Sequence, residues 1–217
     1  MSDPASDHSP NDQVDVNLSG HIRADRAAEG DGEVPAATIQ RRWSPETQFI
    51  GALMWLTAAR AKPVLDLVLD SDIEDPLNAW AIQSIRKLVR QGETPNPALV
   101  IRAAINPASD SQWSPADTAT PGHRYHRFTL HIFNAYEHAL PGASTTVLSY
   151  AREVLDDSYR RAFRVNGTRM IGLADAMADR EDLTDFATEL RTELAAIWRR
   201  TEQLNRLINT AKETPPS

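Results

Sequence analysis

The spacing of apolar residues along the chain is that of α-helices. Between about residues 43 and 211, outside 106–122, apolar side chains recur every three or four positions, which is the period of one buried helix face. Nowhere between turn signals does an apolar/polar alternation run for five residues, as a half-buried strand requires. The sequence therefore predicts an all-α fold, a helical bundle followed by a long antiparallel helical hairpin.

Helix start and stop signals place the bundle at residues 43–140. Ser44-Pro45-Glu46 predicts a helix start, because serine caps a helix, proline fits its first turn and an acid suits the N-terminal dipole. Asp75-Pro76 and Asn96-Pro97 predict two more starts, and Gly92 ends the helix between them. Two further helices are expected over 63–69 and 125–138, and one long surface loop is expected over 106–122.

The second half has the pattern of two long helices joined by a short turn. A Pro-Gly pair at 141–142 breaks the chain, and the helical period then covers 144–177 and 183–210. Because the break between the two helices is short, we expect them to fold back on each other as a hairpin within 141–211.

Both ends of the chain are poor in apolar residues. Residues 1–42 are rich in Asp, Ser, Pro, Gly and Ala and carry eight acids against four arginines. Such a stretch buries too little apolar surface to offset the entropy of ordering, so we expect a disordered acidic N-terminal tail. Residues 212–217 are expected to form a short disordered tail for the same reason.

The composition argues against several function classes. The net charge is -7 and the isoelectric point is about 5.4, whereas strong nucleic-acid binders are usually basic, often with a pI above about 9. No run of 18 apolar residues could span a membrane, and the first residues lack the pattern of a secretory signal. The absence of cysteine excludes disulfides, thiolate metal sites and cysteine nucleophiles. We expect a cytoplasmic protein with no cofactor and at most weak nucleic-acid binding.

A nucleotide-driven motor is not expected. A phosphate-binding P-loop ends in Gly-Lys-[Ser/Thr], whereas the lysines of this chain, Lys62, Lys87 and Lys212, follow Ala, Arg and Ala. The sequence therefore predicts no ATPase activity.

Histidines gather in one segment, but we do not expect them to bind a metal. They are His123, His126, His131 and His138. No cysteine and no HExxH signature accompanies them, and a zinc site needs a third protein ligand. Arg124 and His131 share a helix face and resemble the Arg/His pair of HEPN ribonucleases, although Tyr125 departs from the motif of that family. A HEPN-like ribonuclease is the enzymatic alternative.

The densest basic stretch lies in the first helix of the hairpin. Its arginines are Arg152, Arg160, Arg161, Arg164 and Arg169. Several recur every three to four residues, so one interpretation is a basic stripe that binds a partner or nucleic acid. The other is a solvated helix face whose arginines pair with Glu153, Asp156 and Asp157.

The apolar stripe of the second hairpin helix is too long and wide for a two-helix hairpin to bury alone. Its large residues include Phe186, Leu190, Leu194 and Trp198. We expect part of this stripe to contact another subunit, and a symmetric homodimer is the simplest closed assembly.

Four segments, taken in order, carry a resemblance to a known family. ETQFIGALMWL (46–56) has an acid followed by an apolar Gly-Ala-Leu core, and DPLNAWAIQSIRKLVRQGETPNPALV (75–100) keeps an order of helix, glycine, proline and helix. LPGASTTVLSYAREVLDDSYRRAF (140–163) and EDLTDFATELRTELAAIW (181–198) follow at the spacing of the two hairpin helices. Together they resemble the N-terminal collar domain of the bacterial replicative DNA helicase, the DnaB family, without its motor. Positions in step with the family are Tyr150, Ala151, Val154, Ser158 and Arg161, and Asn78 lies near its usual histidine.

The resemblance implies a role in DNA replication. In that family the domain builds a ring-shaped collar from dimers and docks primase and loading proteins. We therefore expect a non-catalytic protein-interaction and oligomerisation module whose partners are itself and a replicative helicase, primase or helicase loader. The segments 106–122 and 123–138 differ from the family, so contacts made there do not carry over. A small helical regulator that binds nucleic acid through the arginine stripe remains the alternative from another class.

Overall fold

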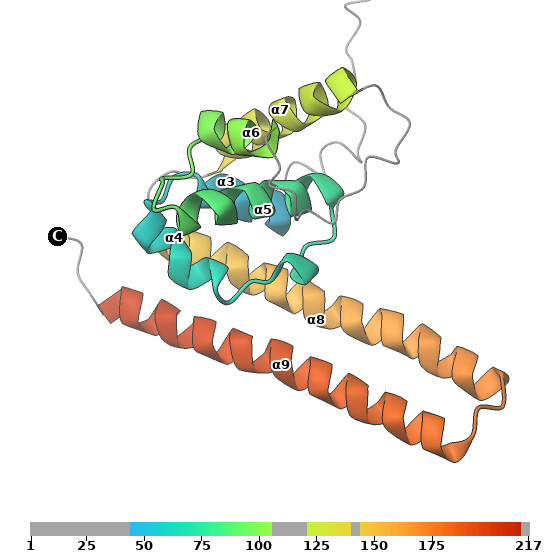
Figure 1. The fold of residues 1–217 in the computed structure, drawn as a ribbon. Coiled ribbons are helices and arrows are strands. Elements are labelled where there is room, and N and C mark those ends of the chain that lie inside the picture. Colours follow the sequence, from blue (N-terminus) through green and yellow to red (C-terminus); the bar gives the residue numbers. More distant parts are fainter. Residues whose placement is uncertain (1–43, 106–120, 140–143, 214–217) are drawn as a thin grey trace, which may run out of the picture. The chain divides into compact units, whose positions relative to one another are not determined.

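A computed structural model describes residues 44–105, 121–139 and 144–213, and these residues are helical with no strand among them. The expected all-α fold is confirmed (Figure 1). The tails expected over 1–42 and 214–217, and most of the expected loop over 106–122, lie outside the described residues.

The bundle consists of five α-helices and one short 3-10 helix. These are α3 (Pro45–Leu53), α4 (Ala58–Leu65), η1 (Asp70–Asp72), α5 (Pro76–Arg90), α6 (Pro97–Ile105) and α7 (Pro121–His138). Three of them begin as the cap residues predict. The side chains of Ser44, Asp75 and Asn96 each accept a hydrogen bond from a backbone N–H in the first turn of the helix that follows. Gly92 has a φ of 77° just after α5, which is the left-handed conformation that ends a helix.

The second helix lies earlier than the sequence suggests. We expected it over 63–69, with Pro63 in the first turn, but α4 spans Ala58–Leu65 and Pro63 lies inside it. Ala61, Val64 and Leu65 are the buried residues of this helix, at the spacing of one helix face. Burial of that face against the core therefore outweighs the preference of proline for a helix start.

Helix α3 is the centre of the bundle. Every residue from Thr47 to Leu53 is buried, and α3 contacts α7, α8 and α5. Gly51 allows the approach of α7, because a Cβ atom at this position would lie 2.0 Å from the carbonyl oxygen of Ala135. The two helices are therefore packed so closely that only glycine fits at the crossing point.

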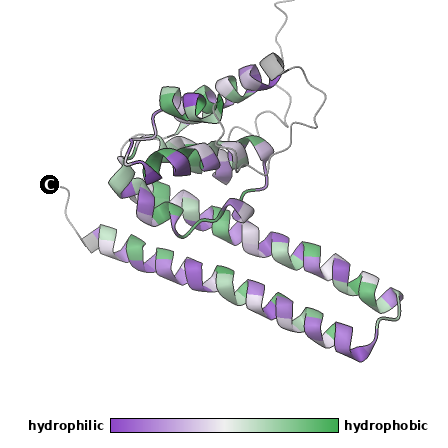
Figure 2. Cartoon of the chain, viewed as in Figure 1, coloured by the Kyte–Doolittle hydropathy of each residue, from purple (hydrophilic) through white to green (hydrophobic). Residues whose placement is uncertain are grey.

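The hairpin expected within 141–211 is formed by α8 (Ser144–Asp175) and α9 (Arg180–Glu213), which run side by side (Figure 1). The turn between them places Met177 at a φ of 53°, and the N–H of Ala178 donates to the carbonyl of Leu173 at 3.0 Å. This is the hydrogen-bond pattern with which many helices end, here with methionine where glycine is usual. Figure 2 shows hydrophobic residues (green) on α8 out to its C-terminal end.

Candidate functional site

A buried cluster around Asp72 joins the hairpin to the bundle. The Asp72 carboxylate is paired with the guanidinium of Arg200 from α9, and it accepts a hydrogen bond of 2.7 Å from Ser158 of α8. Its side chain is 2% exposed and that of Arg200 is 15% exposed. Arg200 also donates to the carbonyl of Leu67, at 2.9 Å. Both hairpin helices are thereby anchored to the short segment that contains η1.

Two further arginines bind the backbone of the same segment. Arg86 of α5 donates to the carbonyl oxygens of Leu65 and Val68, at 2.7 and 2.9 Å. Arg161 of α8 donates to the carbonyl oxygens of Ser71 and Asp72, at 3.1 and 2.8 Å. These carbonyls lie at the end of α4, in η1 or between the two, and they receive no backbone hydrogen bond. The guanidinium groups therefore satisfy them and hold the segment in place.

Of the arginines expected to form one basic stripe, four are exposed and one, Arg161, binds within the chain. Arg161 is 19% exposed and is held by Glu74 and the backbone described above, so its side chain belongs to the joint between bundle and hairpin. Arg160 pairs with Asp157 at 2.7 Å. Arg169 lies 5.2 Å from the Phe186 ring and 4.0 Å from Glu189 across the hairpin. Arg152 and Arg164 are exposed.

The apolar residues of α9 divide between the inside of the hairpin and its surface. Phe186 is 4% exposed and packs within the chain. Leu190 and Leu194 are half-buried, and Trp198 is 59% exposed. These last three residues line one open groove, whose volume is about 450 Å³. The fold thus brings three of the four expected interface residues to one surface.

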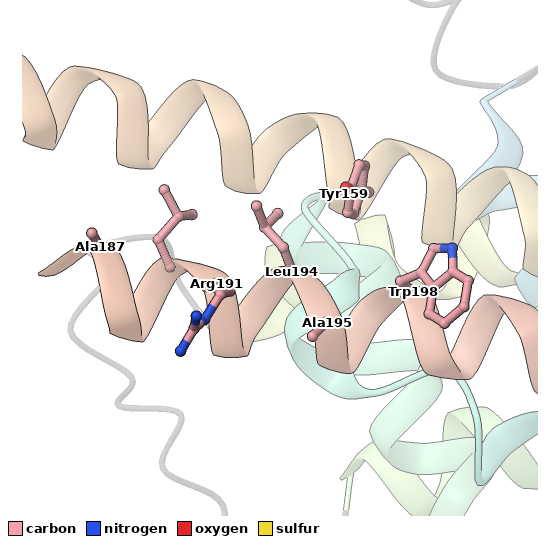
Figure 3. A pocket seen from close by; sticks show the side chains of 7 residues that line it. Tyr159, Ala187, Arg191, Leu194, Ala195 and Trp198 are labelled. Atoms are coloured by element: carbon pink, nitrogen blue, oxygen red, sulfur yellow. The ribbon is translucent and has the colours of Figure 1, made fainter. Parts of the chain in front are cut away.

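The hairpin groove is formed mainly by α9 and is closed on one side by Tyr159 of α8 (Figure 3). Its lining residues are Tyr159, Ala187, Leu190, Arg191, Leu194, Ala195 and Trp198. Tyr159 points toward α9, whereas Arg191 points away from α8 (Figure 3). Phe163, which is 50% exposed, meets the Tyr159 ring edge-on at 5.1 Å and extends the aromatic surface along α8. The groove therefore offers apolar and aromatic side chains with a single charge at its edge.

Tyr159 is the aromatic groove residue that the sequence analysis did not single out. The signal was its spacing of four residues from Phe163 on one face of α8, next to the arginines that drew attention instead.

The histidine and arginine of the ribonuclease hypothesis have structural contacts. His131 is 9% exposed, and its Nε2 lies 2.7 Å from Oδ1 of Asn78. Nε2 carries the proton, because the amide nitrogen of Asn78 already donates to Glu46 and Thr47. The guanidinium of Arg124 lies 5.5 Å from the centre of the Trp80 ring.

Across the described ranges, no group of three or more histidine and carboxylate side chains is placed to hold a metal ion. The side chain of His123 lies outside what the structure describes. Within the same ranges, no helix is long and apolar enough to cross a membrane.

Comparisons of this chain with protein-family models, with curated proteins and with solved structures find no match.

Proposed function

We propose that this protein is a non-catalytic self-association and docking module of DNA replication, and that a second copy binds over the hairpin groove. The observation that carries the proposal is the open groove with Trp198, 59% exposed, at one end. Tryptophan and tyrosine are enriched among the residues that dominate binding energy, and Trp198 and Tyr159 both line the groove.

A second copy is the occupant that best fits the hairpin. The exposed large apolar residues of the hairpin and its turn continue beyond the groove: Phe163, Val165, Met170, Ile171, Met177 and Leu183. An elongated surface of this kind is most simply covered by an equally elongated one. A pair of hairpins related by a two-fold axis supplies such a surface and closes the assembly.

The link to replication rests on the resemblance of residues 46–200 to the helicase collar domain. The fold agrees with that resemblance at a coarse level, since it is a helical bundle followed by a long hairpin. On this proposal a replicative helicase, primase or helicase loader is the second type of partner.

The test of self-association is the mass of the protein in solution, measured by sedimentation equilibrium. Trp198→Glu places a charge in the proposed interface without burying it in the monomer, so we expect a folded monomer where the wild-type protein is a dimer. Leu69→Glu is the matched control, because Leu69 is 44% exposed and lies between α4 and η1. A wild-type protein that stays monomeric at high micromolar concentration would contradict the proposal.

The test of the replication partner is binding of the purified protein to the helicase and the primase of the source cell. Nucleic-acid binding is the competing function, and the exposed Arg152 and Arg164 are the residues that would carry it. Retention on DNA that falls steeply with salt, together with no binding to either protein, would favour that alternative.

A further inference from the structure

Helix α7 has one buried face and one exposed face with large apolar residues on it. Phe128, Ile132 and Ala135 are fully buried against the bundle. On the other side, Leu130 is 51% exposed and Phe133 is 45% exposed. Helix α7 contacts α3, α6 and α5, whereas the hairpin groove lies on α8 and α9. The exposed face of α7 is therefore a surface separate from the groove.

The exposed face of α7 has a symmetric order of residues. His126, Leu130, Phe133 and Glu137 follow one another at steps of four, three and four, which places them along one stripe of the helix. Leu130 and Phe133 lie on either side of the midpoint, and His126 and Glu137 lie at equal distances beyond them. When two copies of this stripe lie antiparallel about that midpoint, Leu130 of each copy faces Phe133 of the other. His126 of each copy then faces Glu137 of the other.

The charges on this face favour an antiparallel neighbour. Arg127 follows His126 in the second turn of α7, and Glu137 lies in its last turn. Neither Arg127 nor Glu137 forms an ion pair with another residue in the part of the chain that the structure describes. A carboxylate at the C-terminal end of a helix is unfavourable toward the dipole of its own helix. An antiparallel second helix offsets this effect, because it places Glu137 beside Arg127 of the other copy.

We propose that α7 is a second self-association surface, on which two copies pair antiparallel with Leu130 and Phe133 at the centre and with Arg127 and Glu137 of opposite copies at the ends. One exposed helix face is small beside the interfaces of stable dimers, so this contact is weak by itself. A dimer formed through the hairpins carries two exposed α7 faces. Once one α7 contact has formed between two such dimers, the second α7 contact forms at a high effective concentration. Two different isologous interfaces on one chain build assemblies larger than a dimer.

The first experiment measures the mass of the full chain by sedimentation equilibrium from low to high micromolar concentration. We expect wild-type protein to exceed the mass of a dimer as concentration rises, and Phe133→Glu to remain a dimer. Leu69→Glu is again the matched control, since Leu69 and Phe133 are exposed to nearly the same fraction, 44% and 45%. Unchanged assembly of Phe133→Glu, or equal losses in both variants, would overturn the proposal.

The second experiment is a charge exchange, which does not depend on an apolar substitution being tolerated. Arg127→Glu and Glu137→Arg each place like charges together at both ends of the antiparallel pair, so each should weaken the association of dimers about tenfold. The double variant, R127E with E137R, restores opposite charges and should recover most of the wild-type association. Additive loss in the double variant would refute the antiparallel pairing.

The two interfaces are distinguished by combining variants. Trp198→Glu removes the hairpin contact and should leave monomers that pair only weakly, through α7, at the highest concentrations, and Phe133→Glu abolishes this pairing in the same chain. If wild-type protein forms hairpin dimers but never larger assemblies, the inference about α7 fails while the proposed function stands. If Trp198→Glu has no effect on mass and Phe133→Glu yields monomers, the proposed hairpin dimer fails and the α7 surface stands.

Discussion

Removal of the Asp72 carboxylate should be among the most destabilising single changes in this chain. The carboxylate accepts from Arg200 with both oxygens, from Ser158 at 2.7 Å and from the backbone N–H of Leu69 at 2.7 Å. In Asp72→Ala all of these donors lose their acceptor, and only Arg200 keeps another, the carbonyl of Leu67. The donors stay largely shielded from water, because the side chain of Arg200 is 15% exposed and Ser158 is 6% exposed.

The magnitude follows from the burial of the pair. Removing one partner of a buried ion pair typically costs about 3–5 kcal/mol, since the remaining charge is left without compensation. A chain of this length loses roughly 2–4 °C of melting temperature per kcal/mol. We therefore expect Asp72→Ala to lower the free energy of unfolding by about 4 kcal/mol and the melting temperature by roughly 8–16 °C.

The assay is chemical unfolding followed by far-ultraviolet circular dichroism, applied to a double-mutant cycle. The variants are Asp72→Ala, Arg200→Met and the two combined. Because the combined variant leaves no buried charge behind, its loss should be clearly smaller than the sum of the two single losses. A loss below about 1 kcal/mol in Asp72→Ala would place the pair in the class of surface ion pairs. Strict additivity in the cycle would show that Asp72 and Arg200 do not stabilise the fold through each other.

Three further predictions concern single positions and use the same unfolding assay. Gly51→Ala should destabilise the fold by several kcal/mol or prevent folding, because the added Cβ would overlap the backbone of α7 at Ala135. Wild-type stability in this variant would contradict the close packing of α3 and α7. Gly167→Ala and Gly172→Ala should each stabilise the protein, by up to about 1 kcal/mol, since nothing lies within 4 Å of the added methyl group in α8; a loss of stability would indicate a contact at these positions. Ser44→Ala removes the side-chain cap of α3 and should cost about 1 kcal/mol, and no change would mean that the cap bond is not formed in solution.

The elements that the sequence predicted well depend on local signals. Helix starts at Ser44, Asp75 and Asn96, and the stop at Gly92, follow from interactions within a few residues along the chain. The hairpin follows from two long stretches of helical period with a short break between them. Leu190, Leu194 and Trp198 were singled out because they belong to an apolar stripe that is wider than one partner helix can bury, and such a stripe is visible in a single sequence.

The features that the sequence did not predict depend on contacts between distant residues. Arg161 resembled its neighbours on the chain, but it binds carbonyl oxygens about 90 positions earlier, and Arg200 meets Asp72 across 128 positions. Nothing near these residues in the sequence distinguishes them from surface arginines. The same holds for α4, whose position is decided by which residues the core buries, and for Gly51, whose role depends on a helix that begins 70 residues later.

The outer part of the hairpin is stabilised by little within its own chain. None of residues 163–185 is buried, and Phe186 is the first buried residue on α9 after the turn. The contacts between the helices in this region include Arg169 with Phe186, Arg169 with Glu189 and Asn166 with Glu193, which are surface interactions of small value. Regions with few buried apolar contacts open locally at a low free-energy cost, and exposed glycines in α8 lower that cost further. Cover by a second copy would add buried contacts to this region, so the length of the hairpin is a further argument for the proposed self-association.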